Sequence, residues 1–364
     1  MTKFAFIIHP LSARDAARKY PMAKYFPDAL IEAFLKRKHP MILSEIKGIK
    51  SLTGATTEGF FIGCPLTVKQ MTTLPIELVY ERITQCAEVA QAAGAEIIGL
   101  GAFTAVVGDG GKTVAERAKI AVTTGNSYTV ATAIEGTMKA CELLEVPVAS
   151  ATLAVVGATG SIGKTCAMVM SRSFGRTILV GRDLARTQAI ADEIGATATT
   201  DISAIKEADA VVTVTSSDAP IIMPEHLKPG CVVCDVSRPR DVSVLVSKER
   251  PDVLVIEGGV VKVPGDVQFN FNFGFPEKTA YACMSETMLL ALEGRAENFT
   301  IGKDVSVEQV DEMIALAKKH GFTLAGFRSF EKAVDQIAID RAKAARKSGV
   351  VPTSVKATPV APVV

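Results

Sequence analysis

The sequence predicts an α/β protein with a doubly wound parallel sheet at its centre. An apolar run at residues 153–156 leads directly into a glycine-rich turn and then into a helical pattern. A second apolar run follows about one β–α–β step later, and three further runs each end in small or polar residues. Strands of this kind form a parallel sheet whose carboxyl ends converge on one ligand crevice.

The glycine-rich turn, which lies within ATLAVVGATGSIGKT at residues 151–165, predicts a phosphate site. Unpaired backbone N–H groups and the positive end of the following helix face the space above the strand. Glycine permits close backbone approach and positive φ there. We expect cofactor contacts from Gly157, Thr159, Gly160, Ser161, Ile162 and Gly163. Residues 158–165 also fit a relaxed P-loop, so dinucleotide and nucleoside triphosphate both remain candidates here.

The length of 364 residues predicts two or three domains. We expect an N-terminal α/β substrate or carrier domain at residues 1–150 and a nucleotide-binding domain at 151–265. A C-terminal helical segment is expected at 266–340. Residues 341–364 are low in complexity and predict a disordered tail.

Charge and hydropathy exclude several classes of protein. Forty basic and 39 acidic residues give a net charge of +1, which argues against a general nucleic-acid or anionic-membrane surface. The apolar segment before His9 has five residues, too short for a signal peptide. The uncharged run at 146–163 contains proline and glycines, and so predicts strand and turn rather than a membrane span. We therefore expect a cytoplasmic protein without a transmembrane segment.

The N-terminal region predicts a mixed α/β domain. Strands are expected at 4–8, 97–100 and twice within 45–61, helices at 29–38 and 76–93, and a mobile loop among the glycines of 99–111. Residues 122–129, VTTGNSYT, precede an apolar helix at 130–144, so Asn126 or Ser127 fits an N-cap. In the alternative interpretation Thr124, Asn126 and Tyr128 line a substrate cleft that faces the nucleotide domain.

The end of the second nucleotide-domain strand predicts the choice of cofactor. Strand 177–180 runs into Arg182, 25 residues after Gly157. An acid at this point hydrogen-bonds the ribose 2′-OH of NAD, whereas an arginine pairs with the 2′-phosphate of NADP. Arg182, with Arg186 one turn further on, therefore favours NADPH. Asp183 belongs to the same site but also suits the N-cap of helix 184–194.

Later strand ends complete the predicted site. Thr215 and Ser216 follow the strand at 210–214 and are expected beside the cofactor. A P-loop enzyme would use Asp235 for magnesium. Gly163 is placed for helix packing and Arg182 has a role only with a dinucleotide, so we favour the Rossmann-type dinucleotide fold.

The seven cysteines show no repeated spacing and predict no disulfide framework. Cys231 and Cys234 lie in an apolar run and predict buried strand residues rather than zinc ligands, and we predict no metal site. A helical stretch follows Pro276. Within it, the residues alone favour a buried core position for Cys283 over a nucleophile.

Several segments resemble the long-chain acyl-[acyl-carrier-protein] reductases of cyanobacteria. They lie in the same order over most of the chain up to about residue 325: IKSLTGATTEGFFIGCPL at 49–66, TTGNSYT at 123–129, VVGATGSIGKT at 155–165, EGGVV at 257–261, YACMSETMLLALEGRAENFTIGKD at 281–304 and KHGF at 319–322. The resemblance implies NADPH-dependent reduction of a fatty acyl thioester to a fatty aldehyde.

The resemblance also implies roles for individual residues. The family's nucleophilic cysteine falls on Cys283, within ACxxE, and would hold the acyl group as a covalent thioester before hydride transfer. Glu286, one helical turn on, would orient a neighbour or handle a proton. Implied partners are acyl carrier protein or coenzyme A as acyl donor, and an enzyme that consumes the aldehyde.

The sequence departs from the family pattern at Lys164, Thr165, residues 268–276 and the tail from Lys343, which leaves chain length and carrier open. Cys64 is a rival nucleophile. CDVSRPRD at 234–241 resembles glutamyl-tRNA reductase, so that a relative of this enzyme or of shikimate dehydrogenase is a second interpretation. The sequence lacks the N-terminal cysteine context and the basic tRNA surface expected of a glutamyl-tRNA reductase. It also has no identifiable Lys/Asp pair, which shikimate-type chemistry would need. A non-catalytic NADPH-binding redox module is the third.

Overall fold

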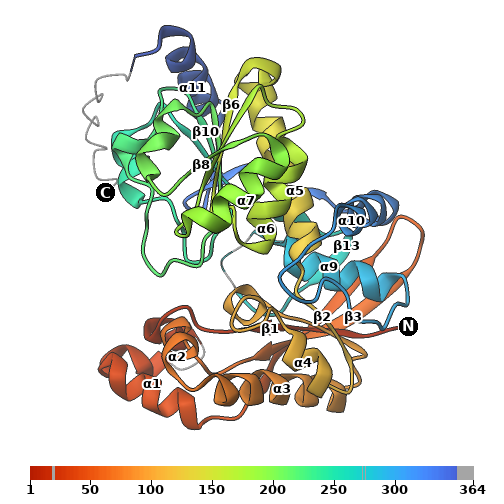
Figure 1. Cartoon of the computed structure of the whole chain (residues 1–364). Coiled ribbons are helices and arrows are strands. Elements are labelled where there is room, and N and C mark those ends of the chain that lie inside the picture. Colours follow the sequence, from red (N-terminus) through yellow and green to blue (C-terminus); the bar gives the residue numbers. More distant parts are fainter. Residues whose placement is uncertain (19–20, 273, 275, 351–364) are drawn as a thin grey trace, which may run out of the picture.

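The computed structural model describes residues 1–18, 21–272, 274 and 276–350. Two six-stranded sheets, each covered by helices, lie one above the other in Figure 1. The lower body contains the N-terminal sheet and the upper body the nucleotide-binding sheet. This is an α/β protein with a Rossmann-type doubly wound sheet, as the sequence predicts.

The N-terminal sheet has the order β13-β2-β3-β1-β4-β5. Its strands are β1 (Phe4–Ile8), β2 (Met41–Lys50), β3 (Thr56–Gly63), β4 (Ile97–Gly99), β5 (Ala121–Thr123) and β13 (Gly265–Gln268). The central strands β3, β1, β4 and β5 are parallel, whereas β2 and β13 run antiparallel at one edge. Helices α1 (Asp28–Arg37), α2 (Val68–Thr73), α3 (Ile76–Ala92) and α4 (Lys112–Arg117) belong to this body.

Strand β1 shows how the period of two separates the cores on the two faces of this sheet. Ala5 and Ile7 pack in the core beneath α3, while Phe4 and Phe6 pack in the core on the opposite face. That second core continues through α9 into the nucleotide-binding sheet. The two sheets therefore share one hydrophobic core.

The nucleotide-binding sheet is wholly parallel, with the order β11-β10-β9-β6-β7-β8. Numbered from its first strand, it has the 3-2-1-4-5-6 order of the dinucleotide fold. The strands are β6 (Thr152–Val156), β7 (Arg176–Val180), β8 (Thr197–Thr199), β9 (Ala210–Thr213), β10 (Val232–Asp235) and β11 (Leu254–Glu257). β9, β10 and β11 are buried throughout, because helices cover both faces of a parallel sheet.

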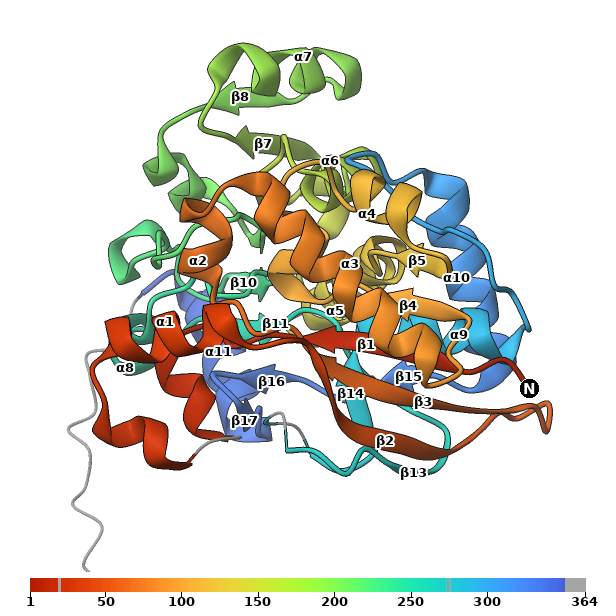
Figure 2. The same ribbon diagram turned by 90° about the horizontal axis from the view of Figure 1, so that it is seen from below.

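Helices α5 (Asn126–Leu143), α6 (Ser161–Met170), α7 (Leu184–Ile194) and α8 (Val244–Glu249) flank this sheet. The long helix α5 also contacts α9 (Ala282–Leu292) and α10 (Val307–His320), which lie over the N-terminal sheet. Figure 2 shows α5, α9 and the strands β1 and β4 close together in projection. α5 and α9 thereby connect the two bodies.

The remaining elements are short. β12 (Val260–Lys262), β14 (Thr279–Tyr281) and β15 (Thr323–Leu324) form a small antiparallel sheet, and β16 (Arg328–Ser329) pairs with β17 (Lys332–Ala333). The 3₁₀ helices are η1 (Ala13–Arg18), η2 (Pro21–Tyr25), η3 (Ala102–Ala105), η4 (Val148–Ser150), η5 (Ile202–Glu207) and η6 (Pro224–His226).

The C-terminal third is helical as expected and corrects two details. Helices α9 and α10 lie within the segment 266–340, and β13 at its start joins the N-terminal sheet beside β2. The helix expected directly after Pro276 begins only at Ala282, and Tyr281 ends strand β14. The tail expected from 341 is wrong as far as Ser348, because α11 (Gln336–Ser348) packs on the nucleotide domain, where Arg346 lies 2.9 Å from Asp209. Residues 351–364 lie outside the described residues.

Two smaller features also differ from the sequence prediction. The glycine-rich segment at 99–111, expected as a loop, contains the 3₁₀ helix η3, in which Phe103 and Thr104 are buried. Asn126 and Ser127 lie inside the first turn of α5, and Gly125 occupies the cap position instead. Within the described residues no helix is both long and apolar enough to cross a membrane.

Candidate active site

The glycine turn joins β6 to α6 and is shaped by two close backbone contacts. Gly157 has φ +84°, and a Cβ there would lie 2.3 Å from the Val214 carbonyl oxygen. A Cβ on Gly163 would lie 2.3 Å from the Gly157 carbonyl oxygen, so this glycine permits the helix to pack on the turn. Gly160 is exposed and precedes the first residue of α6. The turn therefore presents bare backbone and a helix N-terminus, which suits a phosphate group.

The P-loop interpretation does not fit this geometry. α6 begins at Ser161, so the turn consists of residues 157–160 and is too short to wrap around a triphosphate. The hydroxyl of Thr165, which would bind magnesium in a P-loop, is buried and donates to the Val305 carbonyl oxygen at 2.8 Å. The site has the geometry of a dinucleotide fold.

Arg182 and Asp183 follow the end of β7 and have different surroundings. Asp183 caps α7, because its carboxylate accepts a hydrogen bond from the Arg186 backbone N–H at 3.1 Å. Arg182 and Arg186 are both exposed at this strand end. The arginines are thus accessible to a phosphate, whereas the acid is used within the protein.

Thr215 is part of a buried hydrogen-bond network at the neighbouring strand ends. The fully buried carboxylate of Asp241 accepts from the hydroxyls of Thr213 at 2.5 Å, Ser237 at 2.5 Å and Thr215 at 2.6 Å. The Thr215 hydroxyl therefore holds the loops after β9 and β10 together. Ser216 is exposed beside it.

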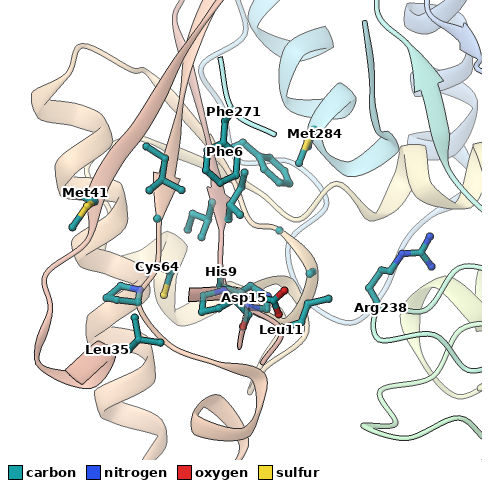
Figure 3. A pocket seen from close by; sticks show the side chains of 18 of the residues that line it. Phe6, His9, Leu11, Asp15, Leu35, Met41, Cys64, Arg238, Phe271 and Met284 are labelled. Atoms are coloured by element: carbon teal, nitrogen blue, oxygen red, sulfur yellow. The ribbon is translucent and has the colours of Figure 1, made fainter. Parts of the chain in front are cut away.

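A mainly apolar cavity of about 210 Å³ lies where the parallel strands of the N-terminal sheet end. Its walls come from the end of β1, the end of β3 and the residues that follow β4, together with Cys283, Met284 and Tyr281. Figure 3 shows Cys64 and Leu35 at one side of this cavity and Arg238 at the other, with His9 between them. The carboxyl-end rule for parallel strands thus applies to both sheets.

Cys283 lines the cavity from the first turn of α9. Burial raises the pKa of its thiol to about 12, and the charge of Glu286 acts in the same direction. Hydrogen bonds from the backbone at Met284, Cys283 and Ala102 oppose this and lower the pKa. In the free protein the thiol is therefore protonated near neutral pH, with backbone donors placed around the sulfur.

Glu286 lies fully buried behind Cys283 and does not line the cavity. Its carboxylate accepts from the Thr123 hydroxyl at 2.5 Å, the Tyr128 backbone N–H at 2.9 Å and the Thr300 hydroxyl at 3.1 Å. Burial raises its pKa, and these hydrogen bonds lower it. A carboxylate at the N-terminus of α5 also complements the helix dipole. Glu286 therefore joins α9 to α5.

Gly125 is the point of closest approach between these two helices, and the sequence analysis did not single it out. Its φ is +75°, and a Cβ there would lie 2.4 Å from both Cα and Cβ of Cys283. The available signal was a glycine within the segment 122–129, just before the predicted N-cap. Only its position against Cys283 shows why glycine is needed there.

The three predicted substrate residues are not brought together. Thr124 is fully buried and donates to the Thr300 carbonyl oxygen at 2.5 Å, and the Tyr128 side chain is buried in the core. Asn126 alone faces the nucleotide turn, because its side-chain N–H lies 3.3 Å from the Ser161 hydroxyl. The N-terminus of α5 is thus in contact with Cys283 through Gly125 and with the glycine turn through Asn126.

His9 and Arg238 line the cavity but were missed from the sequence. Arg238 donates to the Ser237 carbonyl oxygen at 2.6 Å and to the Tyr281 hydroxyl at 3.3 Å, so it connects the nucleotide domain with the residues before Cys283. His9 Nε2 accepts from the Phe103 backbone N–H at 3.1 Å, which places the ring proton on Nδ1, toward the Pro10 carbonyl oxygen. His9 thereby holds the turn η3 beside Cys283. Their only sequence signals were positions directly after apolar strands.

Protonation of His9 should destabilise the protein. Burial lowers the pKa of His9 below its usual 6.5, because a second ring proton would oppose the Phe103 N–H. The unfolded chain then binds more protons than the folded one as pH falls through 6.5, so stability declines toward acid. We expect the free energy of unfolding to drop between pH 7 and pH 5.5, and to drop less in His9→Gln. Denaturant titrations at several pH values measure this, and the exposed His39→Gln serves as the control. Equal slopes in all three proteins would contradict the prediction.

The other cysteines discussed in the sequence analysis are buried. Cys64 is buried and lines the same cavity as Cys283, so it stays the rival nucleophile. Cys231 and Cys234 are fully buried in and beside β10, with burial raising the pKa of each to about 12. Among the described residues no cluster of histidine, cysteine or acidic side chains could hold a metal ion.

Comparison with known proteins supports the class that this fold and site define. Residues 140–256 match the profile of the Shikimate / quinate 5-dehydrogenase family, and this range contains the glycine turn and Arg182. Together with the Rossmann-type sheet order, this match indicates a nucleotide-binding domain similar to that of the Shikimate / quinate 5-dehydrogenase family.

Two curated relatives extend over most of the chain. One is the aminotransferase PigE of Serratia sp., 28% identical over 350 residues, which are 92% of this chain and 41% of that protein. The chain thus spans less than half of that relative. The other is the long-chain acyl-[acyl-carrier-protein] reductase of Synechococcus elongatus, 27% identical over 326 residues, 85% of this chain and 94% of that enzyme.

Among solved structures, shikimate 5-dehydrogenase of Thermus thermophilus in complex with NADP(H) and shikimate is 15% identical with a TM-score of 0.37. The alignment covers 71% of this chain and 87% of that one. L-tryptophan dehydrogenase of Nostoc punctiforme is 10% identical with a TM-score of 0.42, and covers 96% and 89%.

Proposed function

We propose that the protein reduces a fatty acyl thioester to a fatty aldehyde with NADPH, through an acyl group bound to Cys283. The observation that carries this proposal is the position of Cys283. It lines an apolar cavity and contacts the N-terminus of α5, whose next residue, Asn126, contacts Ser161 at the start of α6, directly after the glycine turn. A nucleophile, an apolar site for a chain and a nucleotide cradle are thus parts of one connected structure. The similarity to the Synechococcus elongatus reductase supports the same activity.

The residues of the nucleotide domain fit NADPH. Gly157 and Gly163 lack the Cβ atoms that would collide with backbone at the turn, and the exposed Arg182 and Arg186 suit the 2′-phosphate. Bound NADPH would supply the hydride that reduces the acyl group. Ser216 and Asn126 are the polar side chains that this chain offers beside the cradle.

Acyl capture requires the thiolate of Cys283, because the thiolate is the nucleophile. Its sulfur bonds to the carbonyl carbon of the donor thioester while the carbon–sulfur bond of the donor breaks. The proton of Cys283 ends on the departing thiol, so the exchange is balanced. The backbone N–H groups that lower the pKa of Cys283 also stabilise negative charge that develops beside its sulfur. Release of the reduced acyl group as aldehyde then restores the Cys283 thiol with a proton from solvent.

The acyl donor and the aldehyde acceptor are further parts of the proposal. Acyl carrier protein and coenzyme A both carry acyl groups on a thiol, and either can serve as donor; an enzyme that consumes the aldehyde would be the next partner. We place the reaction in the cytoplasm, because the described chain has seven free cysteines and no disulfide.

The test is incubation with a radiolabelled fatty acyl thioester in the absence of NADPH, followed by denaturing electrophoresis. We expect label on the wild-type protein, no label on Cys283→Ser, and label retained on Cys64→Ser. Label that persists on Cys283→Ser would overturn the nucleophile assignment. Failure of every fatty acyl donor to label the protein would instead favour shikimate-type or glutamyl-tRNA-type chemistry, or a binding module without catalysis.

Cofactor preference has its own test in Arg182→Ala. Loss of a guanidinium that pairs with the 2′-phosphate costs about 1.5–3 kcal/mol, which is roughly a tenfold or larger rise in the Kd for NADPH. The Kd for NADH should not change. Fluorescence titration of both nucleotides measures the two constants. Arg172→Ala, an exposed arginine beyond the far end of α6, is the matched control. An equal loss for NADH and NADPH would remove Arg182 from the 2′-phosphate site.

A further inference from the structure

We propose that the corner of the molecule made by η1, η2 and α1, within residues 11–18 and 21–39, docks onto an anionic lipid surface. This N-terminal corner lies at the edge of the lower body (Figure 1). A small core of its own, Ala13, Ala23, Ile31 and Leu35, holds the three helices together. The side chains discussed next lie outside that core.

The corner exposes an unusual number of large apolar side chains. Five of them, Met22, Tyr25, Phe26, Leu30 and Phe34, have exposed fractions between 44% and 70%. Among the described residues, every aromatic side chain that is largely exposed lies in this corner. Leu30 and Phe34 are four residues apart on α1 and share one face, while Ile31 and Leu35 form the buried face. Contiguous apolar surface of this kind marks a site of interaction.

Charge is concentrated on the same corner. Residues 11–15 and 21–39 contain five basic and three acidic residues, a net charge of +2, whereas the whole chain has +1. Two of the acids are already paired, Asp28 with Arg14 at 2.7 Å and Glu32 with Lys69 at 3.4 Å. Lys24 and Lys38 lie over the rings of Tyr25 and Phe34. The near-neutral charge of the whole chain argues against a general attraction to anionic membranes. The attraction proposed here comes from the basic residues of this corner alone.

These features favour a lipid surface over other occupants. Aromatic and aliphatic side chains flanked by lysine and arginine are typical of helices that lie in a membrane interface, where the rings enter the headgroup region and the cations meet anionic lipids. An acidic carrier protein would match the charge but not the five apolar side chains. The cavity lined by Cys283 is also lined by Leu11, Leu35 and Lys38 of this corner, so the proposed lipid contact lies beside the site for the acyl chain.

Co-sedimentation of the full chain with vesicles tests the proposal. Vesicles of phosphatidylcholine alone are compared with vesicles that contain phosphatidylglycerol, without acyl substrate or nucleotide. The result is therefore independent of the proposed function. We expect binding to the anionic vesicles that is at least tenfold tighter than to the neutral ones and that weakens with salt. No binding to anionic vesicles would overturn the proposal.

Matched variants locate the surface. Leu30→Glu with Phe34→Glu should reduce binding at least tenfold, and Ile314→Glu with Ile337→Glu, two exposed apolar positions on α10 and α11, should not. Binding that survives in the first variant would overturn the assignment. Two other results would also overturn the assignment. Sedimentation velocity could show a dimer that the Leu30→Glu and Phe34→Glu changes break, or the protein could bind an acyl carrier protein more tightly than lipid and lose that binding through the same changes. In either case another occupant would cover the corner.

A spectroscopic probe tests the same proposal without the glutamate variants, which could fail to fold. The chain has no tryptophan, so Tyr25→Trp introduces a single indole at a side chain that is 70% exposed. We expect its emission to shift to shorter wavelength on addition of anionic vesicles. The equally exposed control Ile337→Trp should not shift. An unchanged spectrum for Tyr25→Trp would contradict insertion of the corner.

Discussion

Replacement of Gly125 by alanine is expected to destabilise the protein by about 3 kcal/mol or more and to abolish most of its activity. The residue has φ +75°, a conformation that costs a non-glycine residue of order 1–3 kcal/mol. Its new Cβ would also lie 2.4 Å from Cys283 Cα, and neither neighbouring helix is free to move away. Overpacking of this kind adds about 1–3 kcal/mol. Displacement of Cys283 from the cavity is the reason that activity should be lost.

Gly195→Ala is the matched control for this prediction. Gly195 has φ +68° at the end of α7, and no atom lies within 4 Å of the Cβ that alanine would add. It carries the conformational cost without the collision. Denaturant unfolding and kcat should therefore separate the two variants, with NADPH affinity nearly unchanged in both. If Gly125→Ala and Gly195→Ala lose the same stability, the contact with Cys283 is not important.

Replacement of Glu286 is expected to have the second large effect. Glu286→Ala removes the acceptor of three buried donors, from Thr123, Tyr128 and Thr300. Each unsatisfied donor costs about 1–3 kcal/mol, so we expect a loss of about 3 kcal/mol or more. Glu286→Gln keeps the volume and one acceptor oxygen, and should lose roughly half as much. Thermal and denaturant unfolding measure both variants.

The charge of Glu286 permits a second readout that a purely structural role would not affect. Because this carboxylate raises the pKa of Cys283, Glu286→Gln should lower that pKa and speed alkylation of Cys283 by iodoacetamide at neutral pH. The rate should rise although stability falls. Alkylation that is slower or unchanged in Glu286→Gln would show that the carboxylate acts on position alone. The Cys283→Ser protein gives the background rate.

Much of the fold follows from local patterns. Strand β1 and helix α7 have the predicted bounds, because an apolar run and a helical period bounded by Asp183 and Gly195 are strong local signals. The glycine turn and Arg182 were also visible in the sequence. Strand β14 and helix α11 were not, because β14 pairs with the distant strand β12, and α11 packs against the nucleotide domain.

The candidate site could be predicted only in part, for a similar reason. A motif indicates which residues are suited to a task, but it does not show which of their groups are already used. Thr215, Thr124 and Glu286 are suited by type to cofactor, substrate and proton transfer. The structure places their polar groups in hydrogen bonds with Asp241, the Thr300 carbonyl oxygen and the start of α5, respectively.

The sequence by itself determined the α/β class and the nucleotide turn with Arg182 at the next strand end. These depend on residues close together in the chain, where periodicity and turn chemistry act directly. Cys283 became the candidate nucleophile only through the family resemblance, because its local pattern favoured a core position. Only the tertiary structure decided that Gly125 lies against Cys283, that His9 holds η3, and that the apolar cavity lies between the two bodies. Those features depend on close contacts between segments far apart in the chain, which are set by packing of the shared core and leave no local signal.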